Sequence, residues 1–205
     1  MDYLIFIIVG YVLGAIPFGL VATKLVTKVD VRESGSGKTG MTNVIRVSGK
    51  KVGVTVLLLD MSKAVIAIAL ARIFTDTPGA ESAAGLAALI GHMFPVFAGF
   101  RGGRAISTGW GGLFILNPWA GLIATVIGLT IVYTSRYMSI GSMIGASVGC
   151  IALIIFAATK LDLPGGTPPM EFIWFGAIGG PLIILRHYDN IQRLIKGEER
   201  KFRKG

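Results

Sequence analysis

Long uncharged runs separated by short polar segments dominate the chain. The runs cover residues 3–23, 52–74, 82–100, 105–117, 118–135, 137–159 and 170–185. About 20 apolar helical residues cross a hydrocarbon core of ~30 Å, and backbone groups in lipid must be satisfied within the segment. The pattern therefore predicts an all-α integral membrane protein with seven transmembrane helices, forming a single membrane domain over residues 1–205.

Some of these predicted spans, including the central ones, are short or broken. The uncharged stretch from Ala105 to Ser135 is too long for one crossing and too short for two full ones, and Asn117-Pro118 interrupts it. We therefore expect a short helix, a turn and a second helix in this stretch. The last span is also short, and its outer end must include or adjoin Glu171.

Composition supports the same class of protein. Hydrophobic residues make up 53% of the 205 positions and charged residues only 15%, whereas a soluble domain carries about 25% charge. The single cysteine, Cys150, lies in an apolar run, so no disulfide framework is possible within the chain. The first apolar run is too long for a signal-peptide core and lacks a basic start, so we expect the first helix to stay in place.

The distribution of lysine and arginine predicts the orientation. These residues gather around the first loop, in the third and fifth connections and after the last span, whereas the opposite side has little beyond Arg72 and Lys160. By the positive-inside rule, the N-terminus lies outside and the C-terminus is cytoplasmic. The basic tail, residues 186–205, is interpreted as a topology signal that also touches anionic lipid headgroups.

The first loop contains Gly37-Lys38-Thr39, which is similar to the end of a nucleotide-binding loop. Such a loop needs a further glycine five residues before Gly37, and Arg32 occupies that position. The preceding segment is mixed and charged, whereas a nucleotide-binding loop follows a buried strand. These departures argue against a nucleotide hydrolase.

Polar clusters converge on the predicted cytoplasmic face. Glycines beside serine or threonine let backbone N–H groups approach an anion, and arginine forks match phosphate oxygens. The clusters predict a phosphate-bearing ligand that meets the bilayer at its cytoplasmic surface. A tight turn between packed helices is the alternative for Gly102-Gly103. The clusters are Gly35-Ser36-Gly37 with Gly40, Thr42, Asn43 and Arg46; Phe100 to Arg104; Ser135 to Ser142; and Arg186 to Asn190.

Several polar residues lie inside the predicted spans. Asp60 and Lys63 share a helix face and form either a structural ion pair or a functional one. His92 is either a proton donor or a hydrogen-bonded packing residue. Neither His92 nor His187 begins a His-x-x-x-x-Asp motif, so neither has the aspartate that would make it a familiar catalytic base. Apart from Asp189, neither has nearby carboxylates or thiols at metal-ligand spacing, so we expect no metal and no cofactor.

Five segments together resemble the bacterial acyl-phosphate:glycerol-3-phosphate acyltransferase family. They are GSGKTGMTNVIRVSGK, DMSK, GHMFPVFAGFRGGRAIST, SRYMSIGS and RHYDNIQRLIKGEE, in the family's order. The resemblance implies a seven-helix enzyme that transfers a fatty acyl group from acyl phosphate, not a thioester, to the 1-hydroxyl of glycerol 3-phosphate. The products are lysophosphatidic acid and phosphate, in the first step of phospholipid synthesis. The implied location is the bacterial inner membrane, with the active site facing the cytoplasm.

The same resemblance assigns roles to residues. Two positions depart from the family, which usually has asparagine at Lys38 and lysine at Arg104; arginine keeps the charge but cannot give up a proton. The implied partners are the two substrates and membrane lipid, with no nucleic acid, and we expect a monomer. The implied catalytic residues are Arg46, Arg104 and Ser142, and the implied substrate-binding residues are Ser36, Gly37, Thr42, Asn43, Gly102, Gly103, His187 and Asn190.

The chemistry needs no dedicated base, because acyl phosphate is an activated anhydride and a substrate phosphate can take the proton. We expect no well-placed Asp or Glu. The competing function is a transporter of a phosphorylated metabolite or anion, which the glycine content and broken central helices also fit. The chain has no internal repeat, and its polar clusters gather at one face and not at the midplane, which argues against transport.

Overall fold

The computed structural model describes residues 2–201, and every regular element in this range is helical. Arg203 and Lys204, which contributed to the predicted orientation, lie outside the described residues. Three short 3₁₀ turns, η1 (Val31–Glu33), η2 (Val96–Ala98) and η3 (Met170–Phe172), lie in the connections. The α-helices are α1 (Asp2–Ala15), α2 (Phe18–Thr27), α3 (Met41–Thr75), α4 (Pro78–Met93), α5 (Ile106–Leu116), α6 (Pro118–Ser135), α7 (Met138–Ala158), α8 (Ile173–Leu185) and α9 (Tyr188–Ile195).

Within the described residues, five helical segments are long and apolar enough to cross a membrane. Two shorter apolar segments, Ile106–Leu116 and Met170–Leu185, accompany them. The predicted all-α, multi-span class is confirmed, and the count of seven crossings stays a prediction. The five longer segments are Tyr3–Thr27, Met41–Thr75, Pro78–Ala98, Pro118–Ser135 and Met138–Ala158.

The predicted break between α5 and α6 is present. Asn117 adopts an extended conformation, and its side chain accepts a hydrogen bond from the Ala120 backbone N–H at 2.9 Å. Pro118 occupies the first turn of α6, where backbone N–H groups make no intrahelical hydrogen bond, so the absence of an N–H in proline costs nothing there. This pair therefore ends one helix and starts the next.

Three predicted spans differ in detail from the helices. The first span is broken at Ile16-Pro17, because proline lacks the N–H needed to continue a helix. The second segment starts at Met41, but Gly49, with φ 86° and ψ 170°, divides it into two helices, and the second of these begins near residue 52 as predicted. The α-helix of the third span ends at Met93, because Pro95 disfavours helical geometry in the residue before it, and the turn η2 continues the span to Ala98, close to the predicted residue 100.

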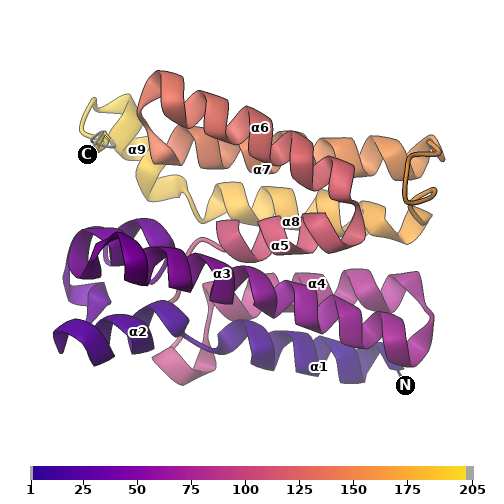
Figure 1. Ribbon diagram of the computed structural model, residues 1–205, viewed down its shortest axis with the longest axis horizontal. Coiled ribbons are helices and arrows are strands. Elements are labelled where there is room, and N and C mark those ends of the chain that lie inside the picture. Colours follow the sequence, from indigo (N-terminus) through magenta and orange to yellow (C-terminus); the bar gives the residue numbers. More distant parts are fainter. Residues whose placement is uncertain (1, 202–205) are drawn as a thin grey trace.

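Small residues allow the helices to pack closely. In α1, Cβ atoms added to Gly10 and Gly14 would lie 2.3 and 2.2 Å from the carbonyl oxygens of Ala84 and Ala88 in α4. A Cβ added to Gly145 in α7 would lie 2.8 Å from the Ala124 carbonyl oxygen in α6. Figure 1 shows α1 beside α4 and α6 beside α7. This packing is typical of membrane helices, because burial of apolar surface does not drive their association.

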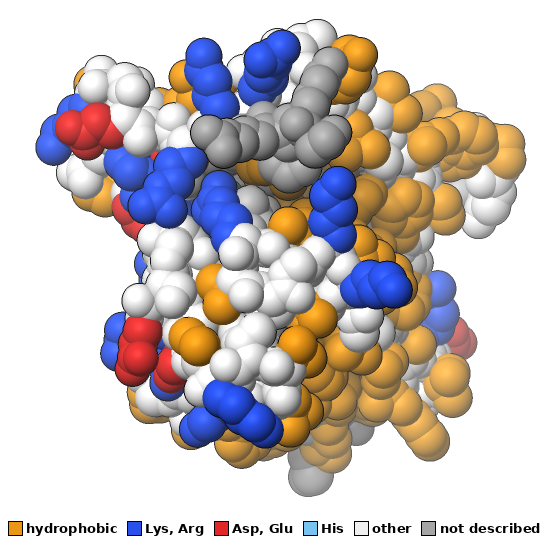
Figure 2. Space-filling model, turned by 60° about the vertical axis from the view of Figure 1, so that its left-hand side comes forward, with side chains coloured by type: hydrophobic (Ala, Val, Ile, Leu, Met, Phe, Trp, Pro, Cys, Tyr) orange, Lys and Arg blue, Asp and Glu red, His pale blue; other side chains and the backbone are white. Residues whose placement is uncertain are grey.

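The polar connections lie together at one end of the bundle. Figure 1 places α2, α9 and the α6–α7 connection at its left end, and the N-terminus and the α7–α8 connection at its right end. Figure 2 turns this left end toward the viewer and shows lysine and arginine side chains gathered there, with hydrophobic side chains along the adjoining flank. The arrangement separates a basic end from an apolar belt.

Candidate active site

A cavity of about 350 Å³ opens between α3 and the α5–α9 segments. Its polar part is lined by the loop before α3, by Arg104, by the start of α7 and by α9. Its apolar part runs between α5, α6, α7 and α8 and includes Leu113, Ala124, Cys150 and Phe175. One cavity thus joins a charged region to a hydrophobic channel inside the helical bundle.

Asn43 organises the loop between α2 and α3. Its side-chain N–H₂ lies 2.9 Å from the carbonyl oxygens of Val31, Ser34 and Lys38, and its side-chain oxygen accepts from the Ser36 backbone N–H at 2.9 Å. The side chain is 2% exposed. Because its side-chain nitrogen and oxygen both have partners, Asn43 shapes the loop that presents Ser36.

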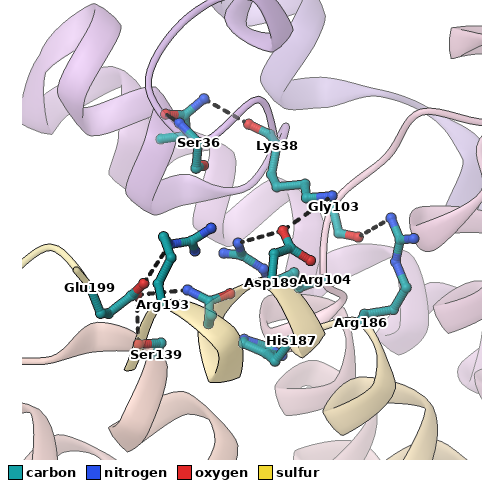
Figure 3. Close-up of polar contacts among 12 residues, drawn as sticks. Ser36, Lys38, Gly103, Arg104, Ser139, Arg186, His187, Asp189, Arg193 and Glu199 are labelled. Atoms are coloured by element: carbon teal, nitrogen blue, oxygen red, sulfur yellow. Dashed lines mark hydrogen bonds and ion pairs between the residues drawn. The ribbon is translucent and has the colours of Figure 1, made fainter. Parts of the chain in front are cut away.

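Asp189, at the start of α9, lies between two cations (Figure 3). Its Oδ2 atom is 3.6 Å from Lys38 Nζ and 3.5 Å from Arg104 Nη2. Burial works against ionisation, but backbone hydrogen bonding and the charges of Lys38 and Arg104 keep the pKa of Asp189 below its ordinary value. Burial in turn lowers the pKa of Lys38. The carboxylate therefore holds two positive groups together near the cavity.

Arg104 has unused hydrogen-bonding capacity. Its Nε and Nη2 atoms are buried and have no hydrogen-bond partner among the described residues, although Asp189 lies nearby. Unpaired buried guanidinium groups are costly, so such donors mark a place where an anion completes the set. Arg104 also lines the cavity. Its free donors are therefore available to a phosphate group.

Glu199 joins three elements around a single carboxylate (Figure 3). Ser139 Oγ and Asn190 Nδ2 each donate to Oε1 at 2.7 Å, and Arg193 Nε donates to Oε2 at 2.8 Å. Burial raises the pKa of Glu199, but these hydrogen bonds outweigh that effect and lower it overall. The contacts hold the chain after α9 against the start of α7, so this part of the basic tail belongs to the cavity wall.

Two carboxylates lie at or near the site, although the sequence predicts none that is well placed as a base. Asp189 is close to the cavity and Glu199 lines it. Both carboxylates have lowered pKa values and pair with cations, so both remain ionised near neutral pH. Such groups are weak bases, and the contacts favour a structural and electrostatic role.

His187 is held as a neutral ring. Its Nδ1 atom lies 2.8 Å from the Ile183 carbonyl oxygen, and the side chain is 2% exposed. Because a carbonyl only accepts, Nδ1 carries the proton and the neutral ring has Nε2 free to accept. Burial lowers the pKa of His187 to about 4. The ring therefore offers the cavity an acceptor and not a positive charge.

The lowered pKa of His187 predicts a pH-dependent stability. The unfolded ring takes up a proton below its ordinary pKa of 6.5, whereas the folded ring resists until about 4, so stability should fall as pH drops through this window. Between about pH 7.5 and 5.5 the loss should be about 1.4 kcal/mol. Over this pH range, thermal unfolding in detergent should show a smaller loss of stability for His187→Gln than for the natural protein. Equal losses in the two proteins would contradict the assignment of this pH dependence to His187.

The predicted site residues divide into two groups. Gly37, Gly102 and Gly103 are not among the residues that line the cavity. A Cβ on Gly103 would lie 2.2 Å from His92 Nε2 and one on Gly102 would lie 2.1 Å from the His92 carbonyl oxygen, so this turn packs against His92. The residues that do line the cavity are Ser36, Thr42, Asn43, Arg46, Arg104, Ser142, His187 and Asn190.

Other cavity residues were not predicted as site residues. Ser139 lies within the quoted segment SRYMSIGS, and Glu199 ends the quoted segment RHYDNIQRLIKGEE, in a basic tail interpreted as a topology signal that also touches lipid headgroups. The sequence offered one signal for Glu199, because Glu198 and Glu199 are two adjacent acidic residues within an otherwise basic tail. The serine and charged residues missed are Lys38, Ser107, Ser139, Arg193, Glu199 and Arg200. Among the described residues, no group of three or more His, Cys, Asp or Glu side chains is placed to hold a metal ion.

Comparisons with known proteins agree with this geometry. The family description "Glycerol-3-phosphate acyltransferase" matches residues 4–197. A glycerol-3-phosphate acyltransferase from Anaeromyxobacter sp. (strain Fw109-5) is 43% identical over 204 residues, covering 98% of this chain and 96% of that protein. One from Dehalococcoides mccartyi (strain ATCC BAA-2266 / KCTC 15142 / 195) is 40% identical, covering 97% and 94%.

A solved structure is similar across nearly the full length. The glycerol 3-phosphate form of PlsY (YgiH), described as an integral membrane glycerol 3-phosphate acyltransferase, has a TM-score of 0.88 at 36% identity and covers 99% of this chain and 96% of that one. Its lysophosphatidic acid form has a TM-score of 0.85 at 35% identity. Sequence and fold agree over the same residues, and the chain belongs to the glycerol-3-phosphate acyltransferase family.

Proposed function

We propose that this protein transfers a fatty acyl group from acyl phosphate to the 1-hydroxyl of glycerol 3-phosphate. The observation that carries the proposal is the single cavity that joins cationic side chains to an apolar channel. A fatty acyl phosphate has the same division, with a charged head and a hydrocarbon tail. Family membership supports the acceptor, because the relatives are named for glycerol 3-phosphate.

In the proposed reaction, the hydroxyl oxygen attacks the acyl carbonyl carbon. A new ester C–O bond forms, the C–O bond to the phosphate breaks, and the phosphate leaves with the bonding electron pair. The hydroxyl proton passes to a phosphate oxygen, because Glu199 and Asp189 are ionised and engaged with cations. The protein mainly orients the two substrates and neutralises their mutual repulsion.

Each side of the polar region has a proposed part in this reaction. Arg46 and Arg104 hold phosphate oxygens, and Ser142 donates a hydrogen bond to the reacting group. Ser36 and Thr42 bind phosphate from the loop and the start of α3. The neutral ring of His187, with Nε2 as acceptor, orients a substrate hydroxyl, and Asn190 completes the wall through Glu199.

The apolar channel is proposed to hold the acyl chain, with Phe175 at its closed end. Cβ atoms added to Gly85 and Gly112 would lie 3.0 and 2.5 Å from the Phe175 ring, so these two glycines make room for it. Phe175 is 1% exposed and lines the cavity together with Leu113 and Cys150. A ring held in this way sets the length of chain that the channel accepts.

Phe175→Ala should shift the preference toward longer acyl phosphates. Two further buried methylenes contribute ~1.6 kcal/mol, so the ratio of kcat/KM for the longer donor to that for the shorter one should rise about tenfold. Phe172→Ala is the matched control, because Phe172 is also buried but does not line the cavity. The same shift in both variants, or none in Phe175→Ala, would place the end of the channel elsewhere.

We also propose seven crossings, with the N-terminus outside and the polar end in the cytoplasm of a bacterial inner membrane. In a Cys150→Ala background, an impermeant thiol reagent applied to intact cells should label Pro78→Cys and Gly165→Cys. It should spare Lys38→Cys and Arg200→Cys, which lie at the basic end of the bundle. The reverse labelling pattern would overturn this orientation and move the site away from cytoplasmic substrates.

Turnover in detergent separates an acyltransferase from a transporter. Purified protein given acyl phosphate and glycerol 3-phosphate should release phosphate although no membrane barrier is present. An acyl thioester in place of acyl phosphate should support no transfer. Binding of phosphorylated compounds without turnover would favour transport of an anion.

A further inference from the structure

A buried charged cluster connects α3 to α4 beside the active-site cavity. Lys63 Nζ lies 2.7 Å from Asp60 Oδ1 and 3.2 Å from Nδ1 of His92, and Asp60 Oδ1 is 3.6 Å from the same nitrogen. All three residues are buried: Asp60 is 1% exposed, Lys63 is 3% exposed and His92 is 5% exposed. Charges within a membrane-spanning helix are costly, so their retention calls for a role that packing alone does not provide. The predicted Asp60–Lys63 ion pair is thus present.

The cluster determines which nitrogen of His92 carries a proton. A lysine ammonium has only donors, so Lys63 donates to Nδ1 and a neutral ring must carry its proton on Nε2. A neutral Lys63 would leave the Asp60 charge uncompensated at 2.7 Å. The neutral ring that accepts from Lys63 therefore presents Nε2–H.

The neighbouring turn is shaped around this ring. The Gly103 backbone N–H donates to the His92 carbonyl oxygen at 3.1 Å, and Nε2 would lie 2.2 Å from a Cβ on Gly103. Arg186 contacts the same turn from the end of α8, with Nη2 3.3 Å from the Gly103 carbonyl oxygen (Figure 3). Arg104 follows directly, and both His92 and Arg104 line the cavity. Glycine at position 103 thus leaves room for the imidazole edge next to the arginine.

We propose that His92 donates an Nε2–H hydrogen bond to an oxygen of the phosphate that leaves the acyl group, beside Arg104. The Asp60–Lys63 pair is a positioning element that keeps the proton on Nε2. The two histidines are then complementary, because His92 presents a donor and His187 presents an acceptor. This inference rests on the proposed function for its substrate. Because negative charge grows on the leaving phosphate, removal of the donor lowers kcat more than it raises KM.

The protonation states can be read without turnover. The chain has only two histidines, so the ¹⁵N NMR spectrum of histidine-labelled protein in detergent contains two rings, and the variant His92→Gln identifies which is which. Near neutral pH, His92 should show a proton on Nε2 and His187 a proton on Nδ1 alone. A His92 ring protonated only on Nδ1 would overturn the inference, and this outcome does not depend on whether the proposed reaction occurs.

Variants test the catalytic part. His92→Leu should lower kcat by ~10², the scale for removing one hydrogen-bond donor to the transition state, and His92→Gln should recover much of it because its side-chain amide can donate. The double variant Asp60→Leu with Lys63→Met removes both charges together, which often leaves stability unchanged. It should lower kcat ~10-fold while KM and the thermal midpoint change little. Without the ion pair, the His92 ring carries its proton on Nε2 only part of the time and so donates only part of the time.

A second ion pair on the same two helices is the matched control. Arg72 and Glu81 link α3 to α4 at 2.7 Å, away from the cavity. Arg72→Met with Glu81→Gln should leave kcat unchanged. Full kcat in His92→Leu, or equal losses in the two double variants, would show that the cluster serves packing alone. If the natural protein transfers no acyl group at all, the proposed function fails, and the NMR result still decides the tautomer.

Discussion

Arg46→Ala is expected to lower kcat/KM by at least ~10², the scale for removing one charge-assisted hydrogen bond to the transition state. Arg46 lies one turn after Thr42 on α3 and lines the cavity. It makes no hydrogen bond or ion pair to the described part of the chain, so its guanidinium is available to a phosphate. The measurement is steady-state turnover with both substrates varied.

Lys50→Ala is the control for Arg46. Lys50 is an exposed cation on the same helix and does not line the cavity. If the effect at Arg46 reflects a specific interaction with substrate, Lys50→Ala should retain full activity. Near-normal turnover of Arg46→Ala would put the phosphate site elsewhere, and equal losses in both variants would indicate a diffuse effect of surface charge.

Arg104 is expected to act by its fixed positive charge. Arg104→Lys should then retain most activity, whereas Arg104→Met should lose at least ~10², with weaker use of both phosphate substrates. The physical reason is that Nε and Nη2 are buried without hydrogen-bond partners in the described chain, and that Asp189 supplies only part of the neutralisation. Arg101→Met, at an exposed position outside the cavity, is the control.

A pH–rate profile separates charge from proton transfer at this position. Arginine does not titrate in the accessible range, and burial lowers the pKa of Arg104 without making it a usable proton donor. If position 104 only neutralises charge, the profiles of the natural protein and Arg104→Lys should superimpose. A new ionisation with lysine, together with a large gain in turnover over a nearly inactive natural protein, would mean that proton transfer is the native task.

The sequence was sufficient for the fold class and for several element boundaries. Asn117-Pro118 ends one helix and begins another through local geometry, so its effect was predictable. The helical segment before Gly49, which carries Arg46, was not, because the apolar pattern begins only near residue 52. A helix that leaves the membrane loses its apolar signal while it keeps its backbone hydrogen bonds.

A site residue was predictable where its own side-chain chemistry indicates its role. It was less predictable where the role depends on the residues that surround it in the folded chain. Arg46, Arg104 and Ser142 were predicted and line one cavity. Asn43, which was also predicted, lines the cavity too, and its hydrogen bonds hold the loop. Glu199 was missed, because its three partners come from α7 and α9 and only the folded chain brings them together.

The central claim is acyl transfer from acyl phosphate to glycerol 3-phosphate, and product analysis tests it most directly. Purified protein in detergent, supplied with both substrates, should form lysophosphatidic acid and inorganic phosphate in equal amounts, and omission of glycerol 3-phosphate should abolish both. Phosphate release that continues without glycerol 3-phosphate, or lysophosphatidic acid formed only from a thioester donor, would contradict the account.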